Sequence, residues 1–240
     1  MKKDPVLPTP RRLAVGPGTG PLVTFDLFSA LIDTRTGASG VLASIAAERG
    51  WEVDGGRLYD EWDRRNKASQ RAEPQWIPFA AHCSRALAAT YEDLGLTGNP
   101  EADAAALLGS AGDWPLWPDV AAGLPALAGR HRVGILSNVD DDVFARTRVV
   151  PLVADDDVLT SERLRACKPH PDIYLRARER AGGELLHVAS SARDVRGAVE
   201  AGIDVIRLRR PGHELDPAGP PPAHEVADLA ELGKLLGVGP

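Results

Sequence analysis

The apolar run VTFDLFSALID, residues 23–33, is interrupted by one acidic residue, Asp26. An ionised carboxylate at the end of a buried strand costs free energy unless it is paired or hydrogen-bonded. A lysine and hydroxyl or amide groups around it would keep it ionised in a partly dry cleft. There it can attack as a nucleophile and form a covalent ester or acyl phosphate. Asp26 is therefore the first candidate catalytic residue.

Three later segments contain polar residues of the kind that such a carboxylate needs. They are ILSNVD at 135–140, CKPHPDIY at 167–174 and HVASSARDVRGAVEAG at 187–202. The candidate site residues in these segments are Ser137, Asn138, Lys168, Ser190, Ser191 and Asp194.

Four short apolar runs predict the buried strands that must position these residues: 22–25, 133–136, 185–189 and 205–208. Helical stretches such as 171–181 and 195–201 lie between the runs, and this alternation predicts an α/β fold with a parallel sheet flanked by helices. Ligands bind such sheets at the carboxyl ends of the strands. Asp26, the pair Ser137 and Asn138, and the ASSARD segment each follow a predicted strand end, so we expect them to lie close together.

About a hundred residues separate the first two predicted strands, far more than a crossover connection needs. Apolar residues at every fourth position, as in Phe79, Cys83, Leu87 and Tyr91, predict helices with one buried face. We expect residues 35–112 to form an inserted, all-helical cap domain, and residues 21–34 and 113–240 to form the core domain.

The two ends of the chain are expected to differ from the core. Residues 1–20 carry positive charge but no apolar segment, which predicts a flexible arm and not a signal peptide. Residues 209–222 are rich in proline and glycine and predict an exposed loop. A final helix is expected at 225–236.

Composition narrows the class of protein and partner. Of the 240 residues, 43% are hydrophobic and 26% are charged, as in ordinary globular proteins. No apolar stretch is long enough to predict a membrane span, and the net charge of −6 argues against nucleic acid as the main partner. Cys83 and Cys167 are too few for a disulfide framework. We expect a cytoplasmic protein that binds a small molecule, and an apolar cap face would suit a homodimer.

The order and spacing of the four motifs resemble those of the haloacid dehalogenase-like hydrolase superfamily, over residues 22–208. The resemblance implies a Rossmann-like core with a helical cap inserted between the first two motifs. It also implies that Asp26 is the nucleophile and that Lys168 is the cation that holds it. Ser137 and Asn138 would then be the polar binding pair, and Asp194 the last acidic group.

Phe28 distinguishes between the chemistries of this superfamily. Members that cleave phosphate monoesters usually carry a second aspartate two residues after the nucleophile, because an alkoxide leaving group needs a proton. Phe28 cannot donate one. The 2-haloacid dehalogenases place an aromatic residue there, so the resemblance favours hydrolysis of a small anionic haloacid without a metal cofactor. Phe28 and Ser29, next to the nucleophile, are candidate substrate-binding residues.

Two departures from the dehalogenase pattern concern binding groups. Ala189 stands where dehalogenases usually have a serine, although Ser190 and Ser191 offer hydroxyls nearby. Asp63 follows Trp62, where dehalogenases place a cap arginine that receives the departing halide. Arg64 is a candidate for this role, but a shift of one residue turns a side chain by about 100° around a helix.

Two other functions stay open. In a magnesium-dependent phosphohydrolase acting on an acyl phosphate, Asp26, the main-chain carbonyl of Phe28 and Asp194 would hold Mg²⁺. In a degenerate, non-catalytic protein the same fold would only bind a small molecule. His82, His170 and His187 share no metal-ligand spacing and are expected in the core or in solvent.

Overall fold

The computed structural model describes residues 20–73 and 75–238, so the arm expected at 1–20 lies almost entirely outside the described residues. Within these described residues, six strands form one sheet in the order β3-β2-β1-β4-β5-β6, and all neighbouring pairs are parallel. The strands are β1 (Leu22–Phe25), β2 (Val133–Ser137), β3 (Val158–Thr160), β4 (Leu185–Ala189), β5 (Asp204–Leu208) and β6 (His224–Val226). The parallel sheet predicted from the alternating pattern is confirmed.

The four predicted strands are the four inner strands of this sheet, and the sequence missed the two at its edges. Inner strands are covered on both faces and therefore consist of continuous apolar residues. The edge strands β3 and β6 have three residues each, and β6 is the polar segment His224–Val226. The prediction of a helix over 225–236 is corrected accordingly: α10 covers only Leu229–Leu235, and Asp228 caps it by accepting a hydrogen bond from the main-chain N–H of Glu231.

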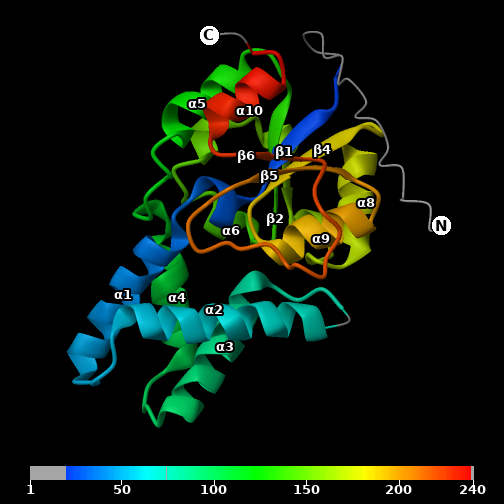
Figure 1. Ribbon diagram of the computed structural model, residues 1–240. Helices are drawn as coiled ribbons and strands as arrows, with labels where there is room; N and C mark the ends of the chain where they lie inside the picture. The colour runs from blue at the N-terminus through cyan, green and yellow to red at the C-terminus, as the bar shows by residue number, and fades with distance from the viewer. Residues whose placement is uncertain (1–19, 74, 239–240) are drawn as a thin grey trace, which may run out of the picture.

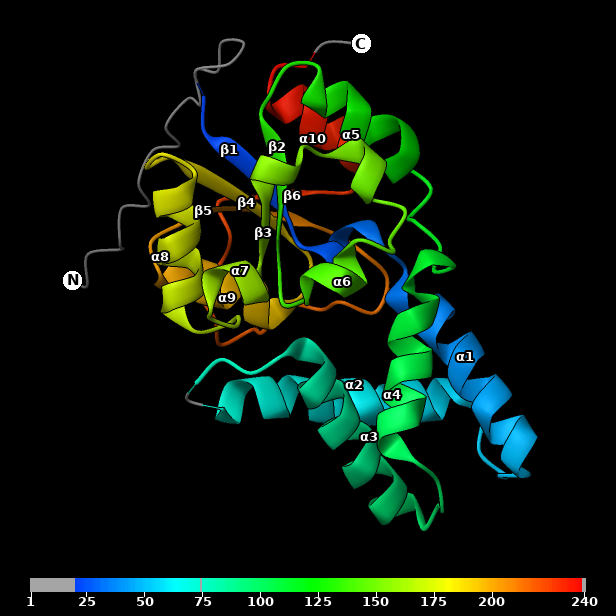
Figure 2. The ribbon, with the colours of Figure 1, turned by 180° about the vertical axis from the view of Figure 1, so that it is seen from behind.

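Helices cover both faces of the sheet (Figures 1 and 2). They are α5 (Val120–Ala128), α6 (Asp141–Phe144), α7 (Ser161–Leu164), α8 (Pro171–Arg180), α9 (Ala192–Glu200) and α10. Alternate residues of a strand point to opposite faces. Val23 accordingly packs in one core cluster with Leu124 of α5 and Leu232 of α10, whereas Leu22 packs in the other with Ile173 of α8 and Val195 of α9.

Four longer helices lie together below the sheet, in the part of the molecule that Figure 1 shows at the bottom. They are α1 (Thr34–Arg49), α2 (Gly55–Ala72), α3 (Phe79–Leu94) and α4 (Pro100–Gly109). Their arrangement supports the proposal that residues 35–112 form a cap. Single turns occur at Leu27–Leu31, Ser110–Gly112, Val150–Leu152 and Asp155–Asp157.

Several hydrogen bonds join the cap helices to the sheet domain. The connections into and out of the cap run side by side, with the main-chain N–H of Asp33 donating to Pro115 and that of Trp117 donating to Leu31. The carboxylate of Asp140, just after β2, accepts hydrogen bonds from the first main-chain N–H groups of α3, at Phe79 and Ala80.

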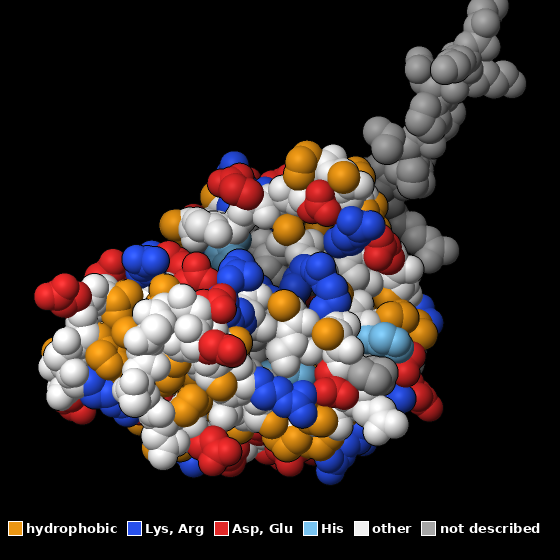
Figure 3. Space-filling view, turned by 90° about the horizontal axis from the view of Figure 1, so that it is seen from below, with side chains coloured by type: hydrophobic (Ala, Val, Ile, Leu, Met, Phe, Trp, Pro, Cys, Tyr) orange, Lys and Arg blue, Asp and Glu red, His pale blue; other side chains and the backbone are white. Residues whose placement is uncertain are grey.

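In the view from below, Lys and Arg side chains gather in the middle of the face (Figure 3). Within the described residues no helix is both long and apolar enough to cross a membrane.

Candidate active site

Asp26 lies where β1 ends and the single π-helical turn Leu27–Leu31 begins. Its Oδ2 accepts hydrogen bonds from the main-chain N–H of Ser29, at 3.0 Å, and from the Ser29 hydroxyl. The main-chain N–H of Asp26 donates to Val188 in β4 across 3.0 Å. The turn after the strand therefore holds the carboxylate at the edge of the sheet.

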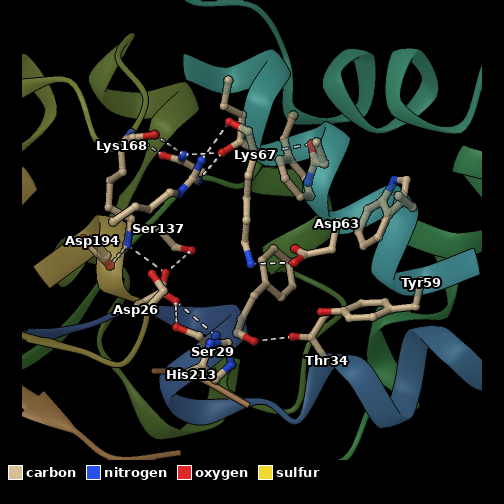
Figure 4. Close-up of a pocket in the computed structure, with 18 of the residues that line it drawn as sticks. Asp26, Ser29, Thr34, Tyr59, Asp63, Lys67, Ser137, Lys168, Asp194 and His213 are labelled. Atoms are coloured by element: carbon tan, nitrogen blue, oxygen red, sulfur yellow. Dashed lines mark hydrogen bonds and ion pairs between the residues drawn. The ribbon is translucent and has the colours of Figure 1, made fainter. Parts of the chain in front are cut away.

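Lys168 joins the two acidic residues that the motifs predicted (Figure 4). Its Nζ lies 2.7 Å from Oδ1 of Asp26 and 2.5 Å from Oδ2 of Asp194, and it donates a third hydrogen bond to the carbonyl of Leu136 at 2.9 Å. The Lys168 residue is only 3% exposed. All three of its ammonium hydrogens thus have an acceptor.

The charges in this cluster decide the protonation of both carboxyl groups. Burial by itself raises the pKa of Asp26, but the charge of Lys168 and the hydrogen bonds from Lys168 and Ser29 outweigh it and leave the pKa below its usual value. Burial likewise opposes ionisation of Asp194, and Lys168 and His187 together hold its pKa well below the usual range. Both carboxylates are ionised at neutral pH.

Ser137 and Asn138 lie beside this cluster but are engaged with the protein. The Ser137 hydroxyl donates to Oδ1 of Asp26 at 3.1 Å. Asn138 Nδ2 donates to Oε1 of Gln70 at 2.7 Å and to the Lys168 carbonyl at 2.9 Å, while its Oδ1 accepts from the Lys168 main-chain N–H at 2.7 Å. Asn138 therefore positions the Lys168 backbone and has no free amide hydrogen for a substrate.

His187 and Tyr174 belong to the same cluster, although sequence reasoning assigned neither a role in it. Nε2 of His187 lies 3.1 Å from Oδ2 of Asp194, and its Nδ1 lies 3.0 Å from the Thr24 hydroxyl. The Tyr174 hydroxyl donates to Oδ1 of Asp194 at 2.7 Å. The only available signal was a histidine within the apolar strand segment LLHVA, seven residues before Asp194.

A pocket lies between this cluster and the cap helices. Its apolar wall is aromatic and consists of Phe28, Tyr59, Trp62, Phe79 and Trp114. The rings of Phe28 and Phe79 stack with their centroids 5.6 Å apart. The polar wall adds Thr34, Asp63, Asn66, Lys67, Gln70, Ser191, Arg193 and His213 to the residues of the cluster. The lining of the pocket thus combines aromatic rings with charged and polar groups.

Two cations that the motifs did not identify reach this pocket. Lys67 extends from α2 into the middle of the pocket, where its ammonium pairs with Asp63 at 2.5 Å (Figure 4). Arg193 of α9 donates to the Lys67 carbonyl at 3.1 Å and to Oε1 of Gln70 at 2.5 Å. Asp63 and Lys67 are one helical turn apart and therefore share a face of α2, a common spacing that by itself does not indicate a pocket.

Two residues expected to bind substrate lie outside the pocket wall. The Arg64 side chain is 64% exposed and pairs with Glu61 at 2.8 Å, because it points to another side of α2 than Asp63 does. Ser190 is fully buried, and its hydroxyl has no hydrogen-bond partner among the described residues. Ser191, one residue later, does line the pocket.

The oxygen atoms that would bind Mg²⁺ in the phosphohydrolase alternative already accept hydrogen bonds from the protein. Each carboxylate oxygen of Asp26 and of Asp194 accepts hydrogen bonds from protein donors, and the carbonyl of Phe28 accepts one from Thr34. Among residues 20–73 and 75–238, no group of three or more His, Cys, Asp or Glu side chains is arranged to hold a metal ion. As placed, these donors do not fit Mg²⁺, which requires several oxygen ligands in a near-octahedral arrangement.

The structure thus combines a parallel α/β sheet, four helices placed below it, and a pocket between them that is lined by Asp26 and Lys168. A family model for haloacid dehalogenase-like hydrolases matches residues 21–202. The chain belongs to this family.

Comparisons with individual proteins give several 2-haloacid dehalogenases. An (S)-2-haloacid dehalogenase 4A from Burkholderia cepacia is 32% identical over 126 residues, 50% of this chain and 54% of that protein. The chain therefore spans about half the length of this relative. An (S)-2-haloacid dehalogenase from Xanthobacter autotrophicus is 29% identical over 80% of this chain and 76% of that protein. The crystal structure of a defluorinating L-2-haloacid dehalogenase has a similar fold, with a TM-score of 0.77 and 24% identity over 93% of this chain and 98% of that one.

Proposed function

We propose that this protein hydrolyses a small 2-haloacid through a covalent ester of Asp26. The observation that carries the proposal is the position of Asp26: it is ionised, held by Lys168 and Ser29, and lines a pocket that the apolar Phe28 also lines. A leaving group that departs without a proton suits such a site, and a halide is one. The names of the relatives support the same substrate class.

In the first step an oxygen of Asp26 attacks C2 of the substrate in line with the carbon–halogen bond. The carbon–oxygen bond forms as the halide leaves with the bonding electron pair. Lys168 keeps Asp26 ionised before the attack, and Asp194 and Asn138 act as positioning residues for Lys168. Water then cleaves the ester and releases a 2-hydroxy acid.

We assign Lys67 and Arg193 to binding of the substrate carboxylate and of the departing halide. The sequence suggested Ser137 and Asn138 for the substrate carboxylate, but their donors are bound to Asp26, Gln70 and Lys168. Lys67 uses one of its three ammonium hydrogens for Asp63, and Arg193 uses two of its five N–H groups for α2. Both therefore retain donors for a carboxylate or a departing halide.

Arg193 lines both the active-site pocket and a neighbouring hollow, which Arg71, Arg196, Glu200 and Asp216 also line. Arg196 is paired with Glu200 and Asp216, so Arg71 and Arg193 are the cations that we expect to attract an anionic substrate to this part of the surface.

The proposal is tested by incubating the purified protein with 2-chloropropionate and measuring chloride release. We expect release by the wild type and by Asp60→Asn, whose carboxylate lies on the surface, and none by Asp26→Asn. Repeated turnover in ¹⁸O water should place the label in the Asp26 carboxylate. Chloride release from the wild type that is no greater than from Asp26→Asn would remove this substrate assignment.

Chelation separates this proposal from the phosphohydrolase alternative. We expect chloride release to be unchanged by EDTA, because no step of the proposed reaction uses a metal. Hydrolysis of acetyl phosphate that requires Mg²⁺ and stops with EDTA would favour the alternative.

We also propose a cytoplasmic location and a homodimer. Cys83 and Cys167 form no disulfide, which is consistent with a cytoplasmic location.

A further inference from the structure

Hydrolysis of the proposed ester requires a base for the attacking water, and Asp194 is poorly suited to this role. Its oxygens accept from Tyr174, His187 and Lys168 at 2.7, 3.1 and 2.5 Å. A carboxylate stabilised in this way has a strongly lowered pKa and is a weak base. Asp194 therefore holds Lys168 in place and is a poor candidate for this base.

His213 is a titratable group of the pocket that the steps described so far do not use. It lies on the loop between β5 and β6 and lines the pocket together with Asp26 and Ser29 (Figure 4). The part of the chain covered by 20–73 and 75–238 provides no hydrogen bond to this imidazole. A neutral imidazole with a free ring nitrogen can accept a proton from water.

Hydrogen bonds to the main chain of the loop, and from the side chain of Arg210, hold this loop in place. The ring of His213 takes no part in them and lines the pocket. Nη2 of Arg207 donates to the His213 carbonyl at 2.6 Å, and the His213 N–H donates to the Arg210 carbonyl at 3.2 Å. Arg210, which is buried, donates to the carbonyl of Ala30 at 3.0 Å and pairs with Asp119 at 2.8 Å. Because Ala30 belongs to the turn that follows Asp26, the side chain of Arg210 connects the loop of His213 to the turn of the nucleophile.

We propose that His213 is the general base that activates water for cleavage of the Asp26 ester; this rests on the function proposed above. A ring nitrogen of His213 takes one proton from the water as its oxygen bonds to Cγ of Asp26. The tetrahedral intermediate then breaks its bond to the substrate oxygen, which receives that proton from His213 and leaves as the hydroxyl of a 2-hydroxy acid. The second proton of the water is released to solvent as Asp26 returns to its carboxylate form.

The charges around His213 come from three elements. Partial burial lowers its pKa, as do Lys67 of α2 and Arg207 of β5, whereas Asp26 and Asp63 raise it. The net direction is downward, so the ring is neutral and able to act as a base at pH 7. Formation of the ester removes the negative charge of Asp26, which favours the neutral ring further.

The test separates formation of the ester from its cleavage. Rapid mixing of 2-chloropropionate with His213→Gln should release about one chloride per enzyme at a rate close to that of the wild type. Steady turnover should fall by about 10²- to 10⁴-fold, the usual contribution of a general base. The intact mass should show the propionyl ester accumulating on Asp26, and added imidazole should restore turnover to His213→Ala. The matched control is His224→Gln, on the edge strand β6.

Each outcome bears on one of the two proposals. Unchanged turnover in His213→Gln without ester accumulation would overturn the role of His213 and leave the proposed function intact. Equal loss of chloride burst and turnover, with no rescue by imidazole, would make His213 a residue of the pocket wall only. A wild type that neither releases chloride nor forms an ester would refute the proposed function and with it this inference. Thermal unfolding of each variant shows whether it is folded.

Discussion

The ammonium of Lys168 donates to Oδ1 of Asp26 across 2.7 Å and connects two residues that are 142 positions apart in the chain. Lys168→Met should keep much of the side-chain volume while leaving Asp26 and Asp194 without their cation. The pKa of Asp26 should rise and turnover should fall sharply. Removing one partner of a buried pair costs about 3–5 kcal/mol, and less where water enters.

Activity and folding are measured separately in this variant. Chloride release measures activity, and urea unfolding measures stability. Lys234→Met, on the surface of α10, is the control. Turnover should fall far more than stability. Wild-type turnover in Lys168→Met would contradict the assignment of Lys168 as the cation that holds the nucleophile.

Lys67→Met should weaken binding of the substrate anion, because it removes an ammonium that Figure 4 places in the middle of the pocket. A hydrogen bond to a charged group contributes about 1.5–3 kcal/mol, so kcat/KM should fall on the order of tenfold to a hundredfold. Arg64→Met, an exposed cation three residues earlier on the same helix, is the control and should change little. Equal effects of the two substitutions on kcat/KM would count against a specific role for Lys67.

Stability should decline in acid because of Asp26 and Asp194, whose pKa values in the folded protein are both lowered. A carboxyl group with a lowered folded-state pKa stabilises the fold above its unfolded-state pKa of about 3.9 and loses that contribution as pH falls below it. The free energy of unfolding, measured in urea between pH 7 and pH 3, should therefore fall most steeply below about pH 4. Asp194→Asn should reduce this slope, and Asp60→Asn should leave it unchanged.

Asp140 should stabilise the contact between the cap and the sheet. Its carboxylate accepts from the main-chain N–H groups of Phe79 and Ala80 at 2.8 and 2.9 Å, at a helix start where Pro78 provides no cap. Asp140→Ala should lower the free energy of unfolding by about 0.5–2 kcal/mol, the usual cost of losing a helix cap. Asp142→Ala, on an exposed carboxylate paired with Arg146, should have a smaller effect. Urea unfolding of both variants gives the comparison.

The sequence alone was sufficient for the parallel sheet, the family and the cluster of residues around Asp26. Strands buried on both faces need continuous apolar residues, and a polar residue directly after such a strand is conspicuous. Asp26 and Ser137 are therefore visible in the sequence, and Lys168 and Asp194 are visible through the family resemblance. The edge strand β3 has only three residues, too few to form a pattern, and β6 is a polar segment, which is why both were missed.

Only the tertiary structure showed which side chains meet in the pocket. Asn138 is an expected binding residue, but its amide is used by Lys168 and Gln70, a contact between the core and the cap. Lys67 and His213 are unremarkable in the sequence, since one lies on a polar helix and the other in a loop rich in proline and glycine. Their positions depend on how the cap and the loop after β5 pack against the turn at Asp26. Such packing depends on contacts between distant parts of the chain, which no local pattern of residue types encodes.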